Sequence, residues 1–235
     1  MMVLESIDAA PKHGDRGAPT EVPVLDRPRG LTIAIGRQAG ARGRSIAVRV
    51  AELLGWQVFD QEMLSLLVQN AAARDELLSE IPPGAFAWAN REVEKLSGSQ
   101  RTAGGESLAE LIRFVFVLAA RGEAIIVGRG AGLLLPVETT LNVRIEAPRS
   151  ERIAYFAQWL RLTEADAAKE VDDRDRQRRS LHESLIGQRS DDSVRYDLAL
   201  NSSRLGEAAC AELIVHALRF KQLGEGSSAE LEPIG

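Results

Sequence analysis

The sequence predicts an α/β fold in which helices cover both faces of a five-stranded parallel sheet. Five short apolar runs that are typical of β-strands are separated by longer segments whose apolar residues recur at helical spacing. Hydrophobic residues make up 45% of the 235 residues, which is enough for a full core and excludes a chain that is disordered throughout.

Charge and cysteine content exclude several classes of function. The chain carries 29 basic and 34 acidic residues, and a net charge of −5 argues against binding to a nucleic acid polymer, which requires a basic surface. The one cysteine, Cys210, excludes an internal disulfide and a cysteine metal cluster. Because Cys210 lies in an apolar helical pattern, we expect a buried thiol rather than a nucleophile.

The two ends of the chain differ in composition from its middle. Residues 1–30 have acidic residues and prolines where a signal peptide would need an apolar core. No segment is long and apolar enough to cross a bilayer. We therefore expect a cytoplasmic protein without a membrane partner, with a single domain at residues 31–222 between flexible tails at residues 1–30 and 223–235.

The first half of the domain alternates strands and helices. A β-rich run at residues 31–35 leads through a glycine-rich loop into a helix over residues 45–55. A second strand at residues 56–60 precedes a helix over residues 61–73. Between about residues 75 and 105, prolines and glycines predict loops around short helices.

The second half continues the alternation. Ser107 and Glu110 have the spacing of a capping box before the next helix, and Thr163 with Asp166 is expected to cap a later one. The remaining elements are a helix at 111–122, a buried strand from 123 leading into a glycine-rich turn, a strand at 142–148, a helix at 149–160, a charged helix after 163, a strand at 196–203 and a last helix.

The loop GRQAGARGRS, which follows the first strand, has several features of a phosphate-binding loop. Its backbone N–H groups lie at the positive end of a helix, and Gly36, Gly40 and Gly43 allow close approach to a phosphate chain. Against the pattern G-x-x-x-x-G-K-[ST], the lysine is replaced by Arg44, while Ser45 keeps the hydroxyl that binds Mg²⁺. The motif alone leaves a phosphate loop and a Gly/Arg-rich surface turn equally open.

Three arginines outside this loop are candidate anion-binding residues. Arg129 follows a central strand, at the sheet edge where α/β proteins bind ligands, and its alternative role is a salt bridge to a carboxylate. Arg174 and Arg178 are four residues apart on one face of a helix. They belong either to a solvated, self-paired face or to a mobile lid that closes on a phosphoryl group.

In this order and spacing, the segments resemble the cytidylate kinase-like family, a branch of the nucleoside monophosphate kinases in the P-loop superfamily. The resemblance spans roughly residues 31–221 and is carried by GRQAGARGRSIA, FDQEML, IIVGRGAG, DRDRQRR and YDLALNSS. It implies a three-layer P-loop kinase fold with an acceptor-binding insertion at about residues 75–105 and a helical lid at about residues 163–190.

The resemblance also implies roles for residues that match the family's motifs, with ATP and Mg²⁺ as cofactors. The implied donor-binding residues are Gly36, Gly40, Gly43, Arg44 and Ser45; the implied acceptor-binding residues are Asp60, Arg129 and Asp175; the implied metal ligands are Ser45 and Asp60; and the implied catalytic residues are Arg44, Arg129, Arg174 and Arg178.

Three departures from the family's pattern bear on the acceptor. Gly130 stands where cytidylate kinases have an aspartate, and Val171 stands at the leading arginine of the lid pattern R-D-x-x-D-x-x-R. The residues after Asp60 are QEML in place of a Ser-Gly-x-x-Tyr-Arg continuation. These departures leave the identity of the acceptor open.

Two hypotheses of function follow. The first is a nucleoside monophosphate kinase-like phosphotransferase that moves the γ-phosphoryl group of ATP to a small phosphorylated acceptor such as CMP or dCMP. The second is a catalytically weak or inactive nucleotide-binding sensor with the same fold, motivated by the missing lysine and by Gly130 and Val171. Both imply small nucleotide partners, and the related kinases are often monomers.

Overall fold

A computed structural model describes residues 30–79, 81, 83–98, 105–186 and 195–226. The expected N-terminal tail, except Gly30, and most of the C-terminal one lie outside these residues. The last helix, α9 (Ser202–Gly226), continues four residues past the domain boundary expected at residue 222. None of the helices built from the described residues is long and apolar enough to cross a membrane.

The sheet has five parallel strands in the order β2-β3-β1-β4-β5, as the alternating pattern predicts. Their bounds are β1 Thr32–Arg37, β2 Gln57–Phe59, β3 Ala124–Val127, β4 Thr140–Glu146 and β5 Leu198–Asn201. In the central register, Ile33 of β1 lies between Ile125 of β3 and Leu141 of β4. All three side chains are buried, which explains why these strands read as continuous apolar runs.

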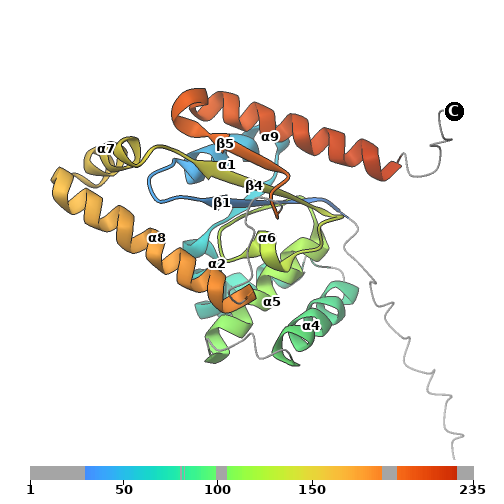
Figure 1. The fold of residues 1–235 in the computed structure, drawn as a ribbon. Helices are drawn as coiled ribbons and strands as arrows, with labels where there is room; N and C mark the ends of the chain where they lie inside the picture. Colours follow the sequence, from blue (N-terminus) through green and yellow to red (C-terminus); the bar gives the residue numbers. More distant parts are fainter. Residues whose placement is uncertain (1–29, 80, 82, 99–104, 187–194, 227–235) are drawn as a thin grey trace, which may run out of the picture.

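Helices form a layer on each face of the sheet, as Figure 1 shows. On one face, α1 (Gly43–Leu54) and α9 pack on Ile33 and Ile35, whose side chains point to the same side of β1. On the other face, α5 (Gly105–Arg121) packs with α2 (Gln61–Gln69) and α4 (Pro83–Gly98) in a core that includes Ala34. Cys210 is buried in the first core, as expected.

The helices before β3 differ from the expected ones. The helix expected at residues 61–73 is two helices, α2 and α3 (Ala71–Ser79), because Asn70 between them has an extended backbone. Much of the region predicted as loops forms α4, which begins at Pro83, where the missing proline N–H costs no helical hydrogen bond. The predicted capping box is wrong, because α5 already begins at Gly105 and Ser107 lies inside it.

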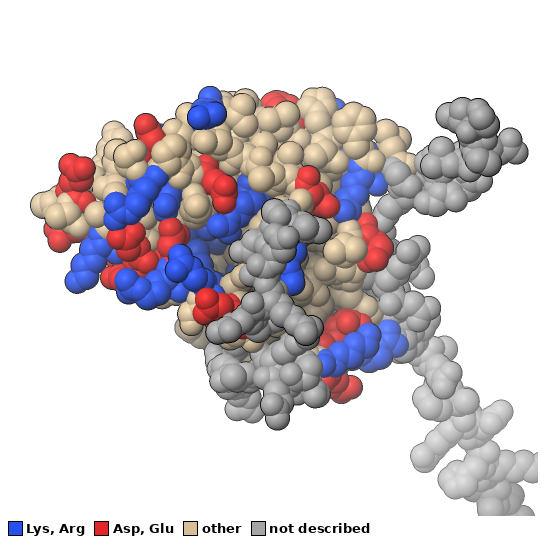
Figure 2. Space-filling model, in the orientation of Figure 1, with Lys and Arg blue, Asp and Glu red and all other residues tan. Residues whose placement is uncertain are grey.

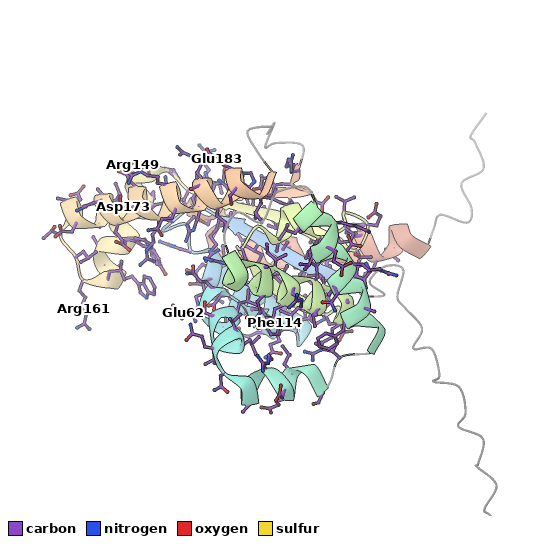
Figure 3. All side chains as sticks on the ribbon, turned by 90° about the horizontal axis from the view of Figure 1, so that it is seen from below. Glu62, Phe114, Arg149, Arg161, Asp173 and Glu183 are labelled. Carbon is purple, nitrogen blue, oxygen red and sulfur yellow. The ribbon has the colours of Figure 1, made fainter. Side chains whose placement is uncertain are left out.

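After β3 come a short helix, α6 (Ala131–Leu134), and, after β4, a hairpin of two helices, α7 (Arg149–Leu160) and α8 (Glu164–Ile186). Thr163 accepts a hydrogen bond from the backbone N–H of Asp166 and donates one to its carboxylate, so the predicted cap of α8 is confirmed. Figure 3 shows the hairpin extending away from the sheet, with Arg161 at its tip. The last residues of the predicted lid, 187–190, lie outside the described residues.

Candidate active site

A large cavity lies at the carboxyl edge of the sheet, between the N-terminus of α1, the start of α2 and the α7–α8 hairpin. Its volume is about 1130 Å³. Guanidinium groups from three separate segments meet on its wall: Arg44 after the loop, Arg129 after β3, and Arg174 with Arg178 on α8. Gly40, Gly43, Ser45 and Asp60 line the same cavity. The cavity therefore unites most of the predicted site residues.

Two of the predicted residues lie elsewhere. Gly36 and Asp175 line a second, smaller cavity of about 220 Å³, and Arg129 and Arg178 are shared between its wall and that of the first. Figure 2 shows basic and acidic side chains interleaved over the hairpin, and α8 carries ion pairs between residues three or four apart, such as Arg174 with Glu170 and Arg176 with Asp173.

The loop before α1 leaves the N-terminus of that helix open toward the large cavity. Arg42, the residue before the helix, has a left-handed backbone and makes no capping hydrogen bond with its side chain, and the first turn holds no acidic residue. First-turn N–H groups have no partner within a helix, so they attract an anion. At Gly40 a Cβ atom would lie 2.5 Å from the carbonyl oxygen of Arg152, so only glycine fits.

Arg44, in the position of the missing lysine, pairs with carboxylates of the α2 side. Its Nε lies 2.8 Å from Asp60 Oδ2, and its Nη2 lies 3.7 Å from Glu62. Asp60 is fixed by the helix that follows, since its Oδ1 accepts hydrogen bonds from the N–H groups of Glu62 and Met63, both at 3.0 Å. Arg44 therefore links the phosphate loop to the start of α2.

Ser45 and Asp60 form an oxygen donor set that suits Mg²⁺ only together with a ligand. The Ser45 hydroxyl and the Asp60 carboxylate both line the cavity, and within the described residues no cluster of three or more His, Cys, Asp or Glu side chains could hold a metal ion. Mg²⁺ is commonly held by one or two protein oxygens, substrate phosphates and water. The residues present fit a magnesium ion that arrives with a nucleotide.

Arg129 has a hydrogen-bond donor that none of the described residues satisfies. Its backbone is left-handed at φ 57°, which turns the side chain from β3 toward α2, where Nη2 donates to the side-chain oxygen of Gln61. Nε is buried without a hydrogen-bond partner among the described residues, and burial lowers the pKa of the guanidinium. Gln61, the first residue of the departing QEML segment, therefore positions this arginine.

The two lid arginines reach the cavity in different ways. Arg174 pairs with Glu170 one turn earlier at 2.5 Å and lies over the ring of Phe156. Arg178 donates to the backbone carbonyl of Arg37 at 3.3 Å, and burial lowers its pKa, with a partial opposing effect of Asp175. Both side chains are partly buried and line the cavity, and each also has a carboxylate of α8 nearby, Glu170 for Arg174 and Asp175 for Arg178.

Asp175 is engaged by the chain itself. Its Oδ1 accepts from the N–H of Ala39 in the loop at 2.7 Å, and its Oδ2 lies 2.6 Å from Nη1 of the buried Arg152. Arg152 also donates to the carbonyl oxygens of Ala39 and Ala147. This network fastens α8 to α7 and to the loop, and Asp175 lines the smaller cavity together with Arg129 and Arg178.

The structure gives a physical reason for two of the departures from the family pattern. Val171 is fully buried with Ala39 and Phe156 between α7 and α8, where an arginine would lose its hydration. Gly130 has φ 68°, and a Cβ at this position would collide with the buried side chain of Leu185 on α8. An aspartate at residue 130 would therefore require the Leu185 side chain to move.

Aromatic side chains of α7 form the outer wall of the large cavity. The rings of Tyr155 and Trp159 are stacked with centroids 6.2 Å apart, and the Arg42 guanidinium lies 5.1 Å from the centre of the Tyr155 ring. Trp159 is 55% exposed, which is unusual for so large an apolar side chain and contrasts with Trp88, buried in the core.

Arg37 is the main site residue that sequence reasoning missed. It ends β1 directly after Gly36, it is partly buried, and it lines both cavities. The available signal was its place at the carboxyl end of the central strand, the same argument that selected Arg129.

Fold and site together define a P-loop kinase-like protein. A model of the cytidylate kinase-like family matches residues 32–204, and the chain belongs to that family. Comparison with curated proteins gives no match.

One solved structure agrees with the fold, and two further ones are less similar. An uncharacterized protein from Eubacterium ventriosum is 18% identical, with a TM-score of 0.59, over 83% of this chain and 99% of that one. TT1252 from Thermus thermophilus is 18% identical with a TM-score of 0.45 (82% and 97% covered), and shikimate kinase from Acinetobacter baumannii is 14% identical with a TM-score of 0.39 (86% and 97% covered).

Proposed function

We propose that the protein transfers the γ-phosphoryl group of ATP to a small phosphorylated acceptor, with CMP and dCMP as the first candidates. The observation that carries this proposal is the single cavity in which arginines of the loop, the β3 turn and the lid meet beside an uncapped helix N-terminus. Family membership supports a kinase-like function. The departures at Gly130 and Val171 concern the acceptor and leave the donor site intact.

The donor's phosphates bind to the loop. The open N–H groups at the start of α1 and the Ser45 hydroxyl face the cavity, and the stacked rings of Tyr155 and Trp159 offer a flat wall to the nucleoside. Mg²⁺, held on the protein side by Ser45 and Asp60, supplies charge neutralisation for the phosphates when it is bound.

The acceptor's phosphate binds to Arg129, whose buried Nε has an open donor position. A phosphate acceptor is already ionised near neutral pH, so its attack requires no general base. Catalysis is then a matter of positioning the two phosphates and neutralising charge, for which Arg174 and Arg178 on the lid are placed. Closure of the lid keeps water from taking the phosphoryl group.

A phosphoryl-transfer assay with radiolabelled ATP, Mg²⁺ and a panel of nucleoside monophosphates tests the proposal. We expect labelled product with at least one pyrimidine acceptor. ATP binding without transfer to any member of the panel would favour the alternative, a nucleotide-binding sensor in which Arg44 stays paired with Asp60.

A further inference from the structure

The loop lacks the lysine that normally carries positive charge to the phosphates of a bound nucleotide. We propose that Arg37, at the end of β1, supplies this charge and contacts the transferring phosphoryl group, while Arg44 serves to hold the carboxylates of the α2 side. The inference rests on the proposed function for the identity of the ligand, a nucleoside triphosphate. Its structural basis is independent of the acceptor.

Glycines on both sides leave room for the side chain of Arg37. A Cβ at Gly43, the first residue of α1, would lie 2.8 Å from Cβ of Arg37. A Cβ at Gly128, in the turn after β3, would collide with Nη1 of Arg37. The side chain therefore runs from the phosphate loop to the β3 turn, and its guanidinium lies beside Arg129 and Arg178 on the wall common to both cavities.

The charge of Arg37 is uncompensated. Within the described part of the chain no carboxylate forms an ion pair with it. Burial, followed by repulsion from Arg178 and Arg129, lowers its pKa to about 9, so it is still a cation at neutral pH. Asp60 opposes this shift, but one of its oxygens pairs with Arg44. Clustered guanidinium groups without a counter-ion favour a bound anion of high charge.

Arg44 is in the opposite situation. Its side chain is 59% exposed, and it already pairs with Asp60 and contacts Glu62. Turning it onto a phosphate would break these pairs, whereas Arg37 gains a partner without losing one. Arg178 connects α8 to the end of β1, because it donates a hydrogen bond to the backbone carbonyl of Arg37.

The step that Arg37 assists is balanced without a further reactant. An oxygen of the acceptor's phosphate forms a bond to the γ-phosphorus, the bond from that phosphorus to the bridging oxygen breaks, and ADP leaves with the electron pair. Negative charge spreads over the three equatorial oxygens during transfer, and a guanidinium beside them stabilises that distribution more than the ground state.

The test compares Arg37→Met with Arg44→Met and with Arg176→Met, which removes an exposed arginine that pairs with Asp173 and does not itself line the cavity. Two quantities are measured in the full-length protein: kcat for phosphoryl transfer, and the rise in melting temperature caused by inorganic tripolyphosphate. We expect Arg37→Met to lower kcat by about 100-fold or more. It should also abolish the tripolyphosphate effect, without lowering the melting temperature of the ligand-free protein. Arg176→Met should match the wild type in kcat and in the response to tripolyphosphate. Arg44→Met should reduce both quantities less than Arg37→Met does.

An Arg37→Met variant with wild-type kcat and a wild-type response to tripolyphosphate would overturn the inference, as would a larger loss in Arg44→Met. If the methionine variant does not fold, Arg37→Gln, which keeps a polar side chain without the charge, is measured in its place. If the wild-type protein transfers phosphoryl to no acceptor, the proposed function fails, and the tripolyphosphate melting comparison still decides whether Arg37 binds polyphosphate.

Discussion

Arg129 is the residue on which the acceptor assignment depends. Its guanidinium lies on the cavity wall, is oriented by Gln61, and has a buried N–H without a partner among the described residues. A phosphate at this place would satisfy that donor and compensate the burial that lowers its pKa.

Arg129→Ala should therefore raise the KM of the acceptor by about 10-fold or more while changing the KM of ATP little, since a charge-assisted hydrogen bond contributes roughly 1.5–3 kcal/mol. Steady-state kinetics with each substrate varied in turn measures both constants. Gln61→Ala provides the matched control, because it removes the orienting contact and keeps the charge, and should give a smaller effect of the same kind. Equal increases in both KM values would count against the assignment.

Residues that belong to a motif could be singled out from the sequence, whereas contacts that depend on packing could not. Ser45, Asp60, Arg129 and Arg178 lie at the cavity as the motifs indicated. Arg37 was missed because a sequence does not show whether a charge has a partner. Asp175 matched the lid pattern, but the same spacing also suits an ion pair with Arg152 one helix earlier, and only the packing of α7 against α8 distinguishes the two.

Among the elements, α8 combines a structural face and a functional face. Asp175 and Val171 fasten it to α7 and the loop, while Arg174 and Arg178, also on α8, reach the cavity. Two Arg–Asp pairs connect the two helices, one largely buried and one exposed.

Asp175→Asn should destabilise the protein by about 1–3 kcal/mol, because it leaves the cation of Arg152, whose side chain is only 9% exposed, without its charged partner. Urea unfolding measures the change. Asp172→Asn on the same helix is the matched control: its pair with Arg149 is half exposed, so the unfolding midpoint should change little. Equal midpoints for the two variants would show that the Asp175 network does not hold the lid.

Strands and helix ends could be predicted where neighbouring residues in the sequence determine them. All five strands and the cap of α8 were predicted from apolar runs and from Thr163. The division of the helix at Asn70 and the early start of α5 were not predicted, because nothing in the local sequence marks either boundary strongly. The bounds of the helices before β3 depend on how these helices pack against one another and against the sheet.

At the scale of the whole molecule, the sheet order determines the site. β1 lies between β3 and β4, so the loop after β1, the turn after β3 and the hairpin after β4 emerge at one edge, although they are far apart in the sequence. The fold class therefore predicts that arginines from these three segments lie near one another. It does not predict which hydrogen-bond or ion-pair partner each arginine has.

The central claim is that these guanidinium groups surround one polyphosphate. A crystal structure of the protein with Mg²⁺ and a non-hydrolysable ATP analogue tests it most directly. The account predicts the triphosphate on the loop, with oxygens of its terminal phosphate within about 3 Å of guanidinium nitrogens of Arg37 and of at least one lid arginine. A triphosphate bound away from the loop, or on the loop with Arg37 and the lid arginines turned from it, would contradict the account.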